Sequence, residues 1–149
     1  MSRWFVVFTV VFVVLAAQVG TGTAQNTSYL RQVSDIGSTM LHEFSYLADV
    51  ASGTEPLDRA TIARSIITVE ATYQQASDLT PSAGQEDNYR LWLASVRLGR
   101  DASVALAAAL LTDDPVERVA LEREAKAAST QWVMLVTLYS DVFTGKVVP

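Results

Sequence analysis

The stretch Asp113-Asp114-Pro115-Val116-Glu117 contains the most complete helix start in the chain. Asp114 is a residue type that caps helices, Pro115 fits the first helical position, and Glu117 stands at the capping-box position three residues after the cap. This pattern predicts a helix over residues 115–143, which Gly145 ends. Its apolar residues recur every three or four positions and define one buried face: Leu121, Ala125, Ala128, Trp132, Leu135, Tyr139 and Val142.

A leucine- and alanine-rich segment upstream predicts a second helix, over residues 82–111. Two starts remain open: Thr80 as the cap with Pro81 in the first position, or Ser82 as the cap with Gln85 at the capping-box position.

The apolar face of this helix contains two small residues, Gly99 and Ser103. Small residues let a facing helix approach closely, so we expect a large side chain opposite them. The other residues of this face are Tyr89, Trp92, Val96, Leu106 and Leu110.

Two earlier segments also show helical spacing and predict helices over residues 29–52 and 57–77. Asn26-Thr27-Ser28 supplies capping residues for the first, and Ser52-Gly53 supplies its stop. In the second, we expect Ile67 to broaden the buried face. The predicted buried residues are Leu30, Val33, Gly37, Met40, Phe44, Leu47 and Ala51 in the first helix, and Ile62, Ile66, Val69, Tyr73 and Ala76 in the second.

Four amphipathic helices with short connections favour an all-α fold, an up-down-up-down four-helix bundle that occupies residues 25–149.

The segment before the predicted bundle differs from it in composition. Residues 4–17 are apolar apart from Thr9, one cation precedes them, and small residues follow up to Ala24. These features predict a signal peptide over residues 1–24, with the mature chain starting at Gln25. The alternative is an uncleaved anchor, and we expect contact with a membrane only if residues 4–17 are retained in this way.

Charge and cysteine content exclude several functions. The net charge of −5 becomes −6 when the signal segment is removed, because Arg3 is its only charged residue. An acidic chain without a basic cluster argues against a nucleic-acid partner. The absence of cysteine excludes disulfides, cysteine metal sites, a thiol nucleophile and covalent haem attachment. We expect no cofactor.

The single histidine, His42, is the natural starting point for a metal site. A zinc-protease motif needs a second histidine four residues later, where this chain has Tyr46. Asp35, His42 and Asp49 follow one another at seven-residue spacing and share a helix face, so they are candidate metal ligands. That face lies opposite the apolar face, which favours a solvated stripe instead.

The residues expected of an enzyme do not converge in this sequence. Glu70 borders a predicted apolar face and could be partly buried, but no acidic partner for it is evident. There is no Gly-x-Ser-x-Gly nucleophile motif. We therefore expect a protein that is not an enzyme.

The segment from Trp132 to Tyr139 is more apolar than one buried face requires. Val133 and Met134 fall on its outward half, and Val136 lies beside the apolar face. These three residues form a candidate interaction patch for a second copy of the chain, an envelope protein or a membrane. The alternative is a broad buried face with one scattered exposed residue, which is normal. The tail, Lys146 to Pro149, could extend the patch.

Helix punctuation at Leu79-Thr80-Pro81 and again at Asp113-Asp114-Pro115 brackets the Leu/Ala-rich segment. In this order of features, about half of the chain resembles short exported bacterial helical-bundle proteins of uncharacterised function. The resemblance implies a bundle fold and an exported location, and it brings no functional residues.

Together these features predict a non-catalytic binding or interaction module, exported to the periplasm or cell envelope or secreted. The alternatives are a bundle that binds a small ligand or a metal, and a membrane-anchored accessory protein.

Overall fold

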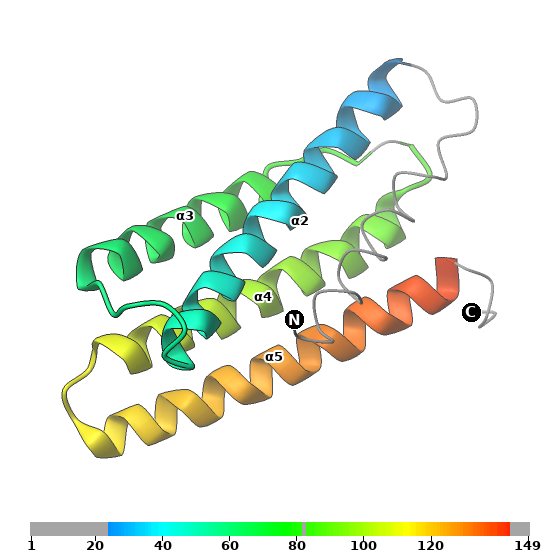
Figure 1. Cartoon of the computed structure of the whole chain (residues 1–149). Helices are drawn as coiled ribbons and strands as arrows, with labels where there is room; N and C mark the ends of the chain where they lie inside the picture. The colour runs from blue at the N-terminus through cyan, green and yellow to red at the C-terminus, as the bar shows by residue number, and fades with distance from the viewer. Residues whose placement is uncertain (1–23, 82, 144–149) are drawn as a thin grey trace.

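The computed structural model describes residues 24–81 and 83–143, and side chains within residues 28–137 (Figure 1). This part consists of four helices without a strand: α2 (Ala24–Ala51), α3 (Arg59–Ser77), α4 (Glu86–Leu111) and α5 (Pro115–Phe143). The all-α prediction is confirmed. Residues 1–23 of the predicted signal segment, Ser82, Gly145 and the tail from Lys146 lie outside the described residues.

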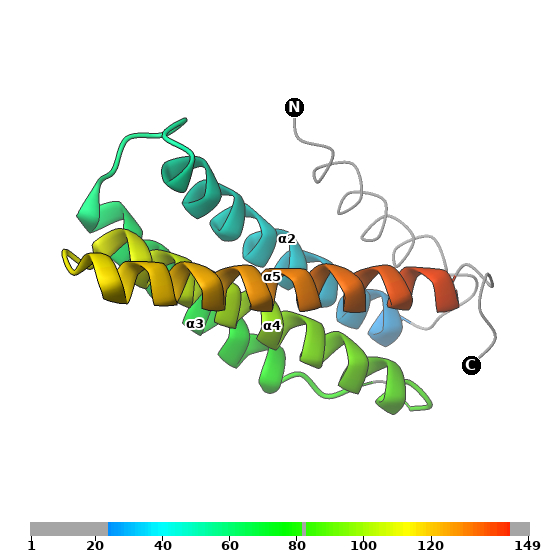
Figure 2. The ribbon, with the colours of Figure 1, turned by 90° about the horizontal axis from the view of Figure 1, so that it is seen from below.

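Successive helices run antiparallel, and α4 lies at the centre of the arrangement (Figure 1). Close backbone packing among the described helices joins α4 to each of the other three, and α2 to α3. The most extensive packing is between α4 and α5, and Figure 2 shows α5 crossing in front of the other described helices. Helix α5 therefore depends on α4 for its backbone contacts.

Two groups of buried apolar residues form the core. The largest side chains that are fully buried are Met40 and Leu47 on α2 and Ile62 and Val69 on α3. The first group is Val33, Ile36, Met40, Val69, Ala76, Trp92, Val96, Trp132 and Val136. The second is Leu47, Val50, Ile62 and Ala107.

The predicted close approach at Gly99 is confirmed. A Cβ atom built on Gly99 would lie 2.8 Å from Cζ2 and 2.9 Å from Cε2 of Trp132, and 3.1 Å from Cγ of Met40. The large side chain opposite the small residue is thus the indole of Trp132. Phe44 on α2 meets the same indole edge to face, with ring centroids 5.4 Å apart and planes at 87°. Through this contact the side chains of α2 reach α5.

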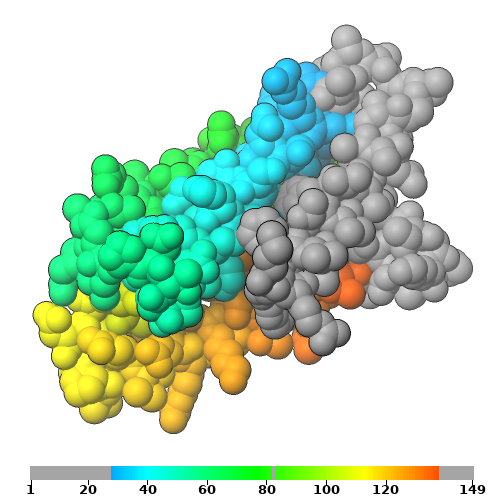
Figure 3. Space-filling view, viewed as in Figure 1, coloured from blue at the N-terminus to red at the C-terminus, as the bar shows by residue number. Residues whose placement is uncertain are grey.

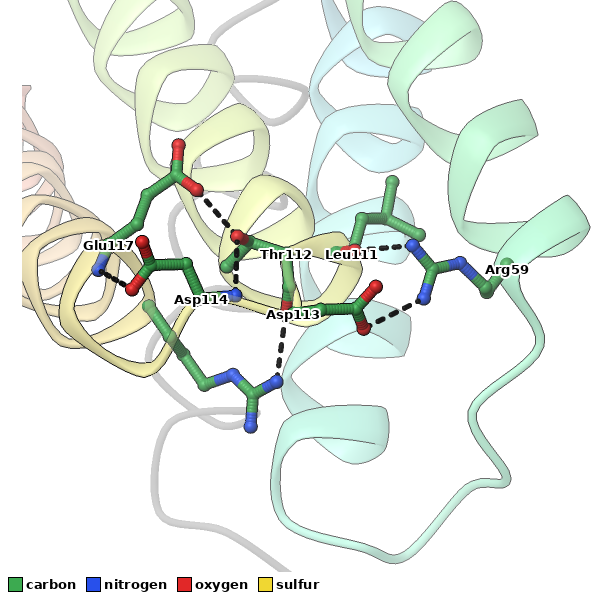
Figure 4. Close-up of polar contacts among 7 residues, drawn as sticks. Arg59, Leu111, Thr112, Asp113, Asp114 and Glu117 are labelled. Carbon is green, nitrogen blue, oxygen red and sulfur yellow. Dashed lines mark hydrogen bonds and ion pairs between the residues drawn. The ribbon is translucent and has the colours of Figure 1, made fainter.

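The connection between α4 and α5 confirms the predicted cap at Asp114 (Figure 4). Its carboxylate accepts hydrogen bonds from the N–H groups of Val116 (2.8 Å) and Glu117 (3.3 Å). The reciprocal bond of a capping box does not form. Instead, the Glu117 carboxylate accepts from the Thr112 hydroxyl at 2.5 Å, and the Thr112 oxygen accepts from the Asp114 N–H at 3.3 Å.

The beginning of α3 is tied to this same connection (Figure 4). Arg59 donates to the Leu111 carbonyl at 2.5 Å and to the Asp113 carboxylate at 3.4 Å. Asp58 caps α3, and its hydrogen bonds from the Thr61 hydroxyl and the Ala60 N–H lower its pKa below the ordinary value. The ion pair and the cap together hold one end of the bundle.

Two predicted helix starts are wrong. Helix α2 already begins at Ala24, so Asn26-Thr27-Ser28 lies inside it rather than capping it. Ala24 and Gln25 are good helix formers and extend the helix upstream. Helix α4 begins at Glu86 rather than near residue 82. Gly84 has φ of 80°, in the left-handed region that a helix excludes, and Gln85 makes no capping bond through its side chain.

The predicted burial of Ile67 is also wrong, because this side chain is 68% exposed. The buried face of α3 instead includes the small polar residues Ser65 and Thr72. The Ser65 hydroxyl donates to the Glu43 carboxylate of α2 at 2.6 Å, and the Thr72 hydroxyl donates to the Thr68 carbonyl at 2.7 Å. Because both hydroxyls have partners, their burial is inexpensive, and α3 turns Ile67 outward.

The Gly99 contact leads to a prediction. Gly99→Ala should destabilise the fold by about 1–3 kcal/mol through overpacking, despite the gain of up to about 1 kcal/mol in helix propensity. In a Trp132→Phe background the added methyl meets fewer ring atoms, so its cost should fall by at least about 1 kcal/mol. Urea unfolding of the four proteins in this double-mutant cycle measures the coupling. Independent, additive effects would contradict the contact.

Candidate functional site

The three residues of the predicted interaction patch do not form one exposed surface. Val136 is 6% exposed and belongs to the core, and Val133 is half-buried against it. Only Met134, at 66% exposure, faces solvent. The assignment of Val136 to an exposed patch is therefore wrong, because α5 turns it toward the same core as Trp132.

The candidate metal ligands Asp35, His42 and Asp49 are all exposed on α2, as expected for a solvated stripe. Seven helical residues span roughly 10 Å along the axis, whereas bonds from metal to ligand are about 2 Å long. The three candidate ligands therefore lie at successive levels along one helix, two turns apart. The residues that the structure describes contain no group of three or more histidine, cysteine or acidic side chains placed to hold a metal.

Arg100 on α4 makes the most extensive polar contacts between two helices. Its Nε and Nη2 atoms lie 3.0 and 2.9 Å from Oε1 of Glu70 on α3, and its Nη1 lies 3.0 Å from Asp101. The guanidinium also lies over the Tyr73 ring, 5.1 Å from the centroid. The hydrogen bond to Glu70 is the main reason that the pKa of Arg100 is raised above its ordinary value.

This cluster explains the position of Glu70, the partly buried carboxylate that the sequence left without a partner. Glu70 neutralises a cation of the neighbouring helix and does not pair with a second carboxylate. A catalytic pair of acids would need both groups beside one cleft. The arrangement instead ties α3 to α4.

An open groove of about 380 Å³ runs between α4 and α5. Apolar side chains that include Val104 and Leu121 line part of it, and Arg100, Asp101 and Glu124 are its charged residues. Arg100 is bound both to its neighbour Asp101 and to Glu70 of α3, so its charge is already paired within the protein. The groove is therefore a concave surface that is partly apolar, and its polar groups are not directed at one common point.

Tyr29, near the start of α2, and Tyr89, near the start of α4, have pKa values above the ordinary value for tyrosine. Burial is the main cause for both Tyr29 and Tyr89, and each is also raised by neighbouring groups, which include Tyr89 in the case of Tyr29. The Tyr89 hydroxyl donates to the carbonyls of Ala76 and Ser77, at 3.0 and 3.2 Å. This phenol thus holds the C-terminal end of α3 against α4.

Sequence reasoning missed a surface that the structure exposes, which we call the α3 outer face: Ala60, Ala63, Ile67 and Ala71. All four residues are exposed, and Ile67 lies between two alanines, four positions away on each side. In Figure 1, α3 lies along one edge of the molecule and α5 along the opposite edge. The space-filling view places the same two helices on either side of α2 (Figure 3). The spacing of the alanines around Ile67 was the available signal.

Among the described helices, none has both the length and the apolar character needed to cross a bilayer.

The Arg100 cluster leads to a second prediction. Arg100→Met should lower the free energy of unfolding by about 1–2 kcal/mol, since it removes charge-assisted hydrogen bonds and the contact with Tyr73. Arg97→Met is the matched control. Arg97 is more exposed than Arg100, and its ion pair with Asp101 is longer, at 3.9 Å. The loss of Arg97 should therefore cost less than about 0.5 kcal/mol. Equal losses in urea unfolding would show that the cluster does not tie the helices together.

No family model, curated protein or solved structure matches this chain. The assignment of a function therefore rests on the surfaces and contacts described above.

Proposed function

We propose that the protein is an exported, non-catalytic binding module of the cell envelope that contacts its partner through the α3 outer face. The observation that carries this proposal is Ile67, a large aliphatic side chain exposed at the centre of an apolar stripe on a regular helix. Contiguous exposed apolar surface of this kind is typical of interaction sites.

The polar side chains next to this face support the same function. Glu70 binds Arg100, and Ser65 binds Glu43, so both of these α3 residues hold neighbouring helices. These contacts fix the orientation of α3 from its inner side. The apolar stripe on its outer side is then presented on a rigid helix, which favours recognition because little ordering is needed on binding.

The proposed export rests on the N-terminal sequence. Residues 1–23 lie outside the described residues, and the proposed mature start, Gln25, lies within α2. The four helices α2–α5 pack against one another, and their core residues start at Val33. Removal of residues 1–24 would therefore leave the described core intact, which is compatible with a cleaved signal peptide.

Intact mass spectrometry of the protein from the envelope or secreted fraction tests export. We expect a chain that begins at Gln25. A full-length chain recovered with membranes would support the anchored alternative, and a full-length chain in the cytosol would contradict export.

Site-specific photo-cross-linking in cells tests the binding surface. A photoactivatable residue at position 67 should give a discrete adduct, because the α3 outer face contacts a partner. Position 134 is the matched control, since Met134 is a similarly exposed apolar residue of α5, the helix along the opposite edge of the molecule. Adducts at position 134 alone would place the binding surface on α5, and a lack of adducts at both positions would contradict the proposed function.

A further inference from the structure

We draw no further inference here: the strongest candidate, the partly apolar groove between α4 and α5, carries none, because Arg100 beside it is already paired with Glu70 and Asp101 and nothing in the described part of the chain shows what covers the groove.

Discussion

The contact between Gly99 and Trp132 is the constraint on which the arrangement of the helices depends. Any side chain larger than hydrogen at position 99 would overlap the indole, so the absence of a Cβ atom sets how closely α4 and α5 can pack. Met40 and Phe44 meet the same region from α2. One aromatic side chain thus connects three helices, and α4 becomes the element on which the other three pack.

The polar contacts build on this core and position the proposed binding surface. Arg100 and Glu70 join α4 to α3, while Glu43 and Ser65 join α2 to α3. These contacts use the inner and lateral sides of α3. Its remaining side carries Ile67, which is left to solvent in the single chain. The same interactions that stabilise the fold therefore determine which apolar surface is available to a partner.

Local signals in the sequence were sufficient for much of this fold. Asp114 and Pro115 specify a helix start through bonds made within four residues, and α5 begins where they predict. The close approach at Gly99 followed from residue size alone. The orientation of α3 could not be predicted in this way, since the burial of Ser65 depends on Glu43, a partner 22 residues away on another helix. Hydrophobic spacing also placed Val136 only beside the apolar face, whereas the structure buries it within the larger group of core residues.

Proton NMR of the folded chain tests the central contact most directly, through nuclear Overhauser effects from the Hζ2 proton of Trp132. The structure predicts cross-peaks to the Hα protons of Gly99, to the Hγ protons of Met40 and to the ring of Phe44, because all of these groups surround the indole. Cross-peaks from the indole to other helix positions, with none to Gly99, would show that α4 and α5 pack in a different register and would contradict the account.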